Sequence, residues 1–217
     1  MTYLIGVDLG GTFIKTALVS REGKLVHKVE IPSEGERGPD GVIINIIRSV
    51  KSVVKEKGVD LKKVKAIGIG SPGPMDTKNG IVRKAVNLPG WVNIPLRDRI
   101  QSAFGIPANL ENDANAAAYA EYWKGAGQNA CLMIAYTLGT GVGGGIIIEG
   151  KLIRGTNDCA GELGHMTIVP DGDPCACGNR GCLESYASAN SLVRRAMAKI
   201  KSGAQTILRQ WIDEGKP

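Results

Sequence analysis

The clearest candidate for chemistry in this sequence is one histidine with three cysteines in a glycine-rich stretch. His165, Cys175, Cys177 and Cys182 follow the spacing His-x9-Cys-x-Cys-x4-Cys. Three thiolates and one imidazole fill all four positions of a tetrahedral Zn²⁺, which predicts a structural metal with no bound water to activate. The histidine favours zinc over an iron–sulfur cluster, and the alternative is a group of free thiols. The remaining cysteines, Cys131 and Cys159, are predicted to be plain buried residues.

Two glycine-rich turns could bind an anion through backbone N–H groups. The first is Asp8-Leu-Gly-Gly-Thr12 and the second is Leu138-Gly-Thr-Gly-Val-Gly-Gly-Gly145. Glycine lets the backbone approach a ligand closely, and a carboxylate such as Asp8 could hold a hydrated Mg²⁺. The alternative is a tight β-turn without a ligand. The predicted phosphate ligands are Gly10, Gly11, Thr12, Gly139, Thr140, Gly141 and Gly143.

Three carboxylates stand where they could act on a polar substrate. Asp113 lies in Glu111-Asn-Asp-Ala-Asn115, at a predicted strand-to-helix junction. It could accept the proton of an attacking hydroxyl, or it could only cap the helix, and the residues alone leave both open. Glu162 and Glu184 stand beside the metal candidates and could bind a polyol. Paired carboxylates also suit glycoside hydrolysis, but a hydrolase does not need phosphate-binding turns.

The elements that must position these residues follow from hydrophobic periodicity and turn residues. Together they predict an α/β protein. The predicted strands are 3–8, 13–19, 24–31, 64–70, 108–111, 130–137 and 141–148. The predicted helices are 39–57, 95–104, 112 or 113 to 124, 189–202 and 204–214, and a loop covers 165–183.

An internal echo indicates a duplicated architecture. Each glycine turn joins two apolar strands, and each pair is followed by Glu-Gly-Lys and a third strand, at Glu22 and at Glu149. Two similar α/β halves would enclose a cleft, the usual place for a ligand, and could grip a nucleotide's phosphates from both sides. We expect a domain at 1–111 with the first phosphate turn, and at 112–217 the start of a larger domain with Asp113, the second glycine turn and the zinc loop.

Composition excludes several classes of protein. The 217 residues are 43% hydrophobic and 22% charged, as in an ordinary globular protein, and no apolar run is long enough to span a membrane. The N-terminus lacks the pattern of a signal peptide, and an odd number of cysteines argues against a disulfide framework, so we expect a cytoplasmic protein. The net charge of +6 owes much to lysines at 51–65, which we interpret as a solvated helix face rather than a nucleic-acid patch.

The motifs together resemble the ROK family of sugar kinases and repressors, and are most similar to its bacterial glucokinases. The likeness runs along the whole chain in family order. Besides the three motifs quoted above, Gly161-Glu-Leu-Gly-His165 and Cys175-Ala-Cys-Gly-Asn-Arg-Gly-Cys-Leu-Glu184 carry it. The combination of the cysteines with Gly-Glu-x-Gly-His is highly specific, whereas the glycine turns alone are not.

The resemblance implies an actin-like, ribonuclease-H-like duplicated fold with ATP and sugar in the interdomain cleft. It implies transfer of phosphate from Mg-ATP to the 6-hydroxyl of a hexose, most readily glucose, with Asp113 as the catalytic base. It also implies the sugar ligands Gly73, Asn112, Glu162, His165 and Glu184, and a structural zinc that shapes their loop. A homodimer is the family's default assembly.

The length of the chain departs from the family. Family kinases are near 300 residues, so we expect the second domain to be truncated and the activity of this chain to depend on what is missing. Family repressors carry a DNA-binding segment before the first phosphate turn, and here that turn begins at Asp8, so a repressor is not expected. Two alternatives stay open: a catalytically silent sugar-binding module, and a kinase for fructose, mannose or N-acetylglucosamine.

Overall fold

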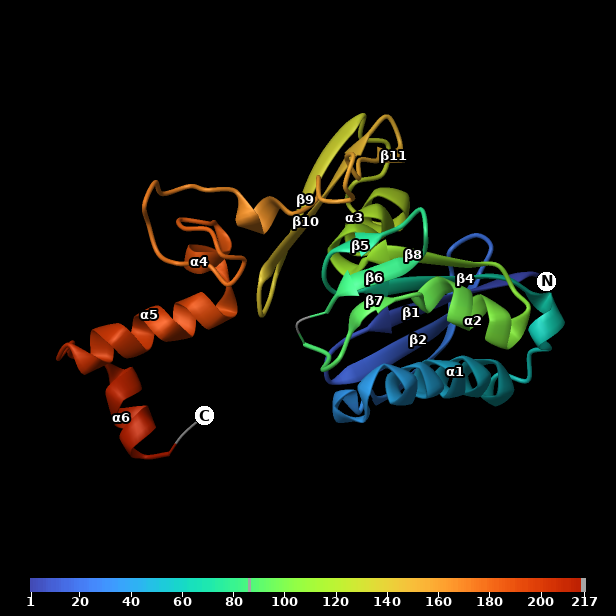
Figure 1. Cartoon of the computed structure of the whole chain (residues 1–217), viewed down its shortest axis with the longest axis horizontal. Coiled ribbons are helices and arrows are strands. Elements are labelled where there is room, and N and C mark those ends of the chain that lie inside the picture. The colour runs from blue at the N-terminus through green and yellow to red at the C-terminus, as the bar shows by residue number, and fades with distance from the viewer. Residues whose placement is uncertain (86, 216–217) are drawn as a thin grey trace. The chain divides into compact units, whose positions relative to one another are not determined.

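The computed structural model describes residues 1–85 and 87–215 (Figure 1). Its strands are β1 (Tyr3–Leu9), β2 (Phe13–Ser20), β3 (Leu25–Pro32), β4 (Val64–Ser71), β5 (Met75–Asp76), β6 (Ile81–Lys84), β7 (Val92–Ile94), β8 (Ala108–Asn112), β9 (Leu132–Leu138), β10 (Val142–Ile148) and β11 (Lys151–Leu152). Its helices are α1 (Gly38–Glu56), α2 (Leu96–Phe104), α3 (Asp113–Lys124), α4 (Glu184–Ala187), α5 (Ala189–Lys201) and α6 (Ile207–Asp213). Each strand and helix predicted from the sequence is present within a few residues of its predicted bounds.

Two compact units divide the chain. The first consists of Met1–Ile134 and Gly145–Gly161, and the second of Ala135–Gly144 and Glu162–Pro217, which is described up to residue 215. The hairpin of β9 and β10 therefore has its base in the first unit and its tip in the second. The predicted division between residues 111 and 112 concerns the duplicated halves and stays a prediction.

A five-stranded sheet in the order β3-β2-β1-β4-β8 is the frame of the first unit. Strands β1, β2 and β3 pair antiparallel, whereas β1–β4 and β4–β8 pair parallel. The register sets Asp8 opposite Gly70, Gly70 opposite Glu111, and Ser71 opposite Asn112. The carboxyl ends of three parallel strands thus meet at one edge of the sheet, and that edge carries the candidate residues of this unit.

The two faces of this sheet are covered by different helices. Alternate residues point to opposite faces, and Ile67 and Ile69 of β4 are buried in the core together with the apolar side of α1. That side of α1 follows helical periodicity, with Val42, Ile43, Ile46, Val50, Val53 and Val54 all buried. On the opposite face, a Cβ built on Gly70 would lie 3.6 Å from the Cα of Asp113. This is an ordinary van der Waals distance, so the start of α3 lies close against this face of the sheet.

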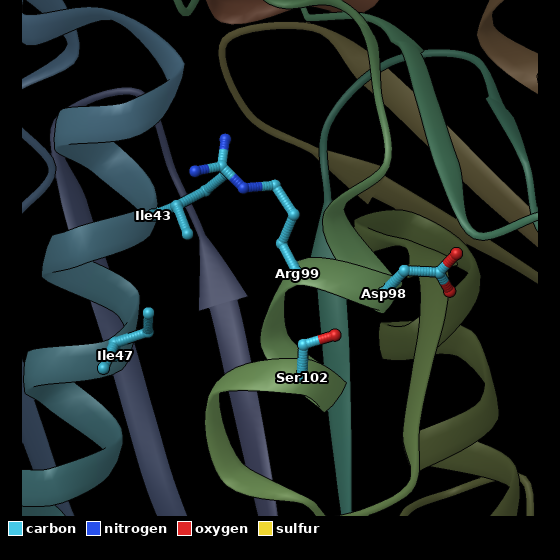
Figure 2. Close-up of a pocket in the computed structure, with 5 residues that line it drawn as sticks. All are labelled: Ile43, Ile47, Asp98, Arg99 and Ser102. Carbon is cyan, nitrogen blue, oxygen red and sulfur yellow. The ribbon is translucent and has the colours of Figure 1, made fainter.

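A surface cavity of about 360 Å³ separates α1 from α2 (Figure 2). Ile43 and Ile47 line it from α1, and Asp98, Arg99 and Ser102 line it from α2. Arg99 reaches across and donates a hydrogen bond to Asp40 at 2.6 Å. None of these residues belongs to the candidate ligand groups, so this cavity plays no part in the site described below.

Three short strands were not predicted from the sequence. Strands β5, β6 and β7 form a small antiparallel sheet in the order β5-β6-β7. Segments of two to four residues are too short for hydrophobic periodicity to reveal. The segment between β6 and β7 packs Leu88 and Trp91 into the main core, with Trp91 only 1% exposed.

The second unit has little apolar core of its own. Among its described residues, the buried apolar side chains are Val142, Leu163, Cys182 and Ile200. Helix α5 begins at a well-formed cap, because the Ser188 hydroxyl accepts the N–H of Ser191. A unit with so small a core needs another source of stability, such as a metal ion.

The surface bears on two sequence-based expectations, and it decides one of them. The prediction that Cys131 and Cys159 are buried is wrong, because both are exposed in the part of the chain that is described. They follow a loop and a short strand and not an apolar helix face, so cysteine's usual preference for burial is overridden. The six lysines of 51–65 are all exposed, as both a solvated face and a nucleic-acid patch require, so the choice between these two interpretations stays a prediction. Among the described residues, no helix has both the length and the apolar character needed to cross a bilayer.

Candidate active site and metal centre

Asp8 and Asp113 lie together at the carboxyl edge of the first unit's sheet. Both line a cavity of about 500 Å³ whose floor includes Gly6, Gly68 and Gly70. Asp8 is the exposed, next-to-last residue of β1, and Asp113 is the first residue of α3. The parallel register of β1, β4 and β8 brings them together although they are far apart in the chain.

Asp113 is not the helix cap, and its role as a base stays a prediction. Asn112 is the cap: its Oδ1 accepts the N–H groups of Ala114 and Asn115 at 2.9 and 3.1 Å. The Asp113 carboxylate accepts one hydrogen bond, also from the Ala114 N–H, at 2.8 Å. Because Asn112 does the capping, the Asp113 carboxylate remains exposed at the rim of the cavity.

The surroundings of Asp113 favour its protonated form. The protein atoms around it withdraw water from the carboxyl and raise its pKa, and the negative charge of Asp8 raises it further. The hydrogen bond from the Ala114 N–H acts in the opposite direction, but the net shift is upward. A carboxylate with a raised pKa is a better proton acceptor than an ordinary aspartate, which suits a general base.

The turns beside this cavity are held by close backbone contacts. Gly10 donates its N–H to the Phe13 carbonyl at 3.0 Å, and the Ser33 hydroxyl donates to the Gly10 carbonyl at 2.7 Å. A Cβ on Gly11 would lie 3.0 Å from the Cβ of Asn87. Gly73 has a φ of +86°, and a Cβ there would overlap the Lys84 carbonyl. These glycines have structural reasons of their own, so phosphate or sugar binding by them stays a prediction.

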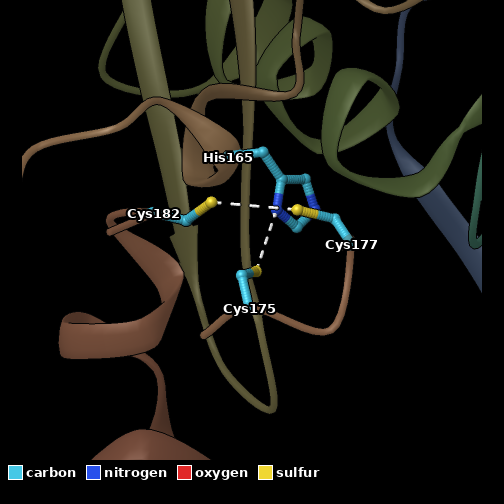
Figure 3. A group of neighbouring side chains, drawn as sticks. All are labelled: His165, Cys175, Cys177 and Cys182. Carbon is cyan, nitrogen blue, oxygen red and sulfur yellow. Dashed lines mark hydrogen bonds between the residues drawn. The ribbon is translucent and has the colours of Figure 1, made fainter. Parts of the chain in front are cut away.

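In the second unit, the predicted metal ligands do come together (Figure 3). The donor atoms of His165, Cys175, Cys177 and Cys182 all lie within 4.8 Å of one another. The Cys175 Sγ is 3.6 Å from the His165 Nδ1, and the Cys177 Sγ is 3.8 Å from the Cys182 Sγ. A tetrahedral zinc with bonds of about 2.3 Å to sulfur and about 2.0 Å to nitrogen separates S from N by about 3.6 Å and S from S by about 3.8 Å. The four residues therefore fit a structural zinc.

Local structure prepares these ligands for a metal. The loop returns on itself through a bridge between Thr167 and Cys182 and another between Pro174 and Arg180. Burial raises the pKa of the Cys175 thiol, but hydrogen bonds from Cys177 and His165 outweigh it and lower that pKa to about 7. Such a thiol readily gives the thiolate that zinc requires.

His165 uses its two ring nitrogens in different directions. Nδ1 faces the cysteines, and Nε2 lies 3.9 Å from the Oε2 of Glu162. The side chains of Glu162 and His165 are both partly open to solvent. One nitrogen is therefore placed for a metal while the other stays beside the carboxylate that was predicted to bind a polyol.

Glu184 lies against the second glycine turn, a contact that the sequence did not predict. Its Oε2 accepts the N–H of Val142 at 2.8 Å. A Cβ on Gly141 would lie 2.4 Å from this oxygen, whereas a Cβ on Gly139 would meet nothing. The turn is tied to the helices as well, because Ala189 donates its N–H to the Gly139 carbonyl at 2.9 Å. Glu184 thus links the zinc loop to the glycine turn within the second unit.

Comparison with known proteins identifies relatives of this chain. A family model described as ROK family matches residues 4–213. A glucokinase of Halalkalibacterium halodurans is 42% identical over 195 residues, which are 89% of this chain and 59% of that protein. A xylose repressor of Caldicellulosiruptor bescii is 35% identical over 216 residues, 99% of this chain and 54% of that protein. The chain thus spans about 59% of the length of the glucokinase.

Solved structures resemble the chain as a whole. A ROK hexokinase from Thermus thermophilus has a TM-score of 0.84 and 37% identity, covering 100% of this chain and 70% of that one. A ROK family glucokinase from Streptomyces griseus, solved with glucose and AMPPNP, has a TM-score of 0.79 and 42% identity, covering 93% and 62%. These likenesses confirm the actin-like, ribonuclease-H-like α/β fold that was predicted from the sequence.

Proposed function

The chain belongs to the ROK family, and from that membership we propose that it takes part in the ATP-dependent phosphorylation of a hexose at its 6-hydroxyl, with glucose as the substrate. The observation that carries this proposal is the pair Asp8 and Asp113 at the rim of one cavity, with the pKa of Asp113 raised. Glucokinases at 42% identity support glucose over other hexoses.

In the proposed reaction, Asp113 is the catalytic base. It orients the sugar hydroxyl and takes its proton while the oxygen forms a bond to the γ-phosphorus and the bond to ADP breaks. The raised pKa favours this step because a stronger base accepts the proton more readily. Asp8 would hold a magnesium ion, which would supply charge stabilisation at the phosphates. The turns at Gly10–Thr12 and at Gly139, Thr140, Gly141 and Gly143 hold the phosphates of ATP.

The proposed sugar ligands are two groups of residues, each within one compact unit. In the first unit they are Asn112, Asp113 and the Gly73 turn. In the second unit they are Glu162, His165 and Glu184, whose loop carries the four metal ligands. We propose that a zinc ion supplies this small-cored unit with its rigidity and performs no chemistry, since all four of its positions are filled by protein. A reducing cytoplasm, which preserves three thiolates, is the proposed compartment, and a homodimer the proposed assembly.

A second function deserves a test because of one observation. A xylose repressor matches almost the whole chain at 35% identity, so a protein named as a regulator also contains a similar chain. Under that reading the chain binds sugar without phosphorylating it. Asp113→Asn separates the two readings because it keeps the shape of the side chain and removes the base.

The experiment is ADP release from the purified chain with Mg-ATP against glucose, fructose, mannose and N-acetylglucosamine. We expect glucose to give the strongest stimulation and Asp113→Asn to lower kcat by about 10²–10⁴-fold, the usual contribution of a general base. Glucose that protects the chain against thermal unfolding without ADP release would favour the binding module. Equal ADP release by the parent chain and by Asp113→Asn would refute Asp113 as the base.

A further inference from the structure

An unassigned contact lies in the loop that follows β11. Asp158 binds Thr77 with both carboxylate oxygens: Oδ2 accepts the Thr77 N–H at 2.8 Å, and Oδ1 accepts its hydroxyl at 2.9 Å. The two residues are 81 positions apart and belong to the same compact unit. Asp158 has a φ of +57°, in the left-handed region that disfavours most side chains. A strained residue that makes two charge-assisted hydrogen bonds is typical of a functional constraint.

A second contact is made by Arg154, which lies four residues earlier in the same loop. Arg154 binds the Oε2 of Glu111 through both Nε and Nη2, each at 2.7 Å. The Oε1 of Glu111 accepts the N–H of Asn112 at 3.0 Å and the side-chain amide of Asn115 at 3.1 Å. The Glu111 side chain is only 17% exposed, so its orientation is well restrained. Arg154 therefore reaches, through one carboxylate, the cap that starts α3 beside Asp113.

The segment that carries both contacts is closed on itself. Ala160 donates its N–H to the Arg154 carbonyl at 2.9 Å, and Gly155 turns the chain with a φ of +74°. Thr77 follows β5 directly and comes three residues after the turn Ser71–Pro74, which is held in turn by the Arg83 N–H on the Pro74 carbonyl. The loop 154–160 thus touches both segments of the first unit that flank the candidate sugar ligands.

We propose that Arg154 and Asp158 form a two-point brace that sets the position of the Gly73 turn relative to Asn112 and Asp113. Neither side chain needs to touch the sugar, so both are positioning residues. The proposal rests on the proposed function, because it assigns the brace to binding of the hexose. Loosening the Thr77 end lets the Gly73 turn move, which weakens sugar binding more than it slows the chemical step at Asp113.

The test separates the carboxylate from the strained backbone. Asp158→Gly removes both hydrogen bonds but suits the left-handed conformation, and Asp158→Asn keeps one acceptor oxygen. Thr77→Val removes the hydroxyl, whereas Thr77→Ser keeps a hydroxyl at this position. Asn129→Gly is the matched control, because Asn129 is exposed, has a φ of +66° and makes no part of the brace.

We expect Asp158→Gly to raise the KM for glucose roughly tenfold, with kcat changed by less than about threefold, and to speed amide hydrogen exchange at Thr77. Asp158→Asn and Thr77→Val should have smaller effects of the same kind, Thr77→Ser should restore the parent KM, and Asn129→Gly should match the parent. An unchanged KM with faster exchange at Thr77 would overturn the positioning role, and an unchanged exchange rate would overturn the brace itself.

These readouts also distinguish failure of the brace from failure of the proposed function. Exchange at the Thr77 amide needs no sugar and no ATP. A parent chain that neither binds nor phosphorylates glucose would overturn the proposed function and the role in sugar binding together, and the exchange result would still report whether Asp158 holds Thr77.

Discussion

The chemistry proposed for the first unit depends on how the charge of Asp8 affects the pKa of Asp113. Asp113 has a raised pKa because surrounding protein atoms withdraw water and because Asp8 carries a negative charge nearby. A base must be ionised to accept a proton. A raised pKa therefore moves the loss of activity on acidification to higher pH than the ordinary aspartate pKa of about 3.9 predicts.

Asp8→Asn tests this coupling without relying on catalysis. It removes one of the causes that raise the pKa of Asp113, so that pKa should fall towards its ordinary value. The measurement is an NMR titration of the Asp113 carboxyl carbon without magnesium or ATP. Asp98→Asn, the same change at an exposed position on α2, is the control and should leave the titration unaltered. A pKa that stays the same or rises in Asp8→Asn would contradict the assignment.

At the scale of the element, helix α1 shows how a pattern becomes stability. Ile46 is 0% exposed and packs on the central sheet, whereas Ile44 on the same helix is 49% exposed. Ile46→Ala leaves a cavity and should lower the free energy of unfolding by about 2–5 kcal/mol. Ile44→Ala removes the same atoms from a half-solvated position and should cost less than half as much. Urea denaturation of both variants measures the two changes in the free energy of unfolding. Equal losses of that free energy would refute the described packing.

The second glycine turn offers a similarly matched pair of variants. Gly141→Ala must displace the Glu184 carboxylate, which breaks its hydrogen bond with the Val142 N–H. The loss of this partly buried charged hydrogen bond should destabilise the second unit by about 1–3 kcal/mol. Gly139→Ala meets open space and should change stability little. The check is the thermal unfolding of both variants, and two indistinguishable melting curves would count against the link between Glu184 and the turn.

At the scale of the whole molecule, the two units have different sources of order. The first has a continuous core of strand and helix side chains, while the second has a small core beside four convergent metal ligands. Zinc binding to such a unit is coupled to its folding. The purified chain should hold one zinc ion, and a chelator should release it together with the order of residues 162–215.

Segment-resolved hydrogen exchange before and after chelation measures this prediction. Exchange should accelerate across the loop 165–183 and helix α5, and change little in β1, β4 and α1. Cys177→Ser, which removes one ligand, should behave like the chelated parent. A chain that is free of zinc as purified, with the loop fully protected, would contradict a structural metal.

The sequence by itself determined much of the local structure and the four residues of one candidate metal centre. Strand and helix positions follow from periodicity, because alternation and the 3.6-residue repeat report directly which face is buried. The zinc ligands were predicted because their types and short spacing place them in one loop, and the structure brings all four together. The resemblance to the ROK family gave the fold, since it joins several motifs in a fixed order.

Only the tertiary structure decided which distant residues meet. Asp8 and Asp113 come together through the parallel register of three strands, and Asp158 and Thr77 through the loop that follows β11. Hydrophobic periodicity also could not predict that Asn112 rather than Asp113 caps α3, or that Cys131 and Cys159 are exposed. It likewise did not reveal the short strands β5, β6 and β7. Periodicity describes the neighbours of a residue along the chain, whereas these contacts depend on how separate segments pack against one another in space.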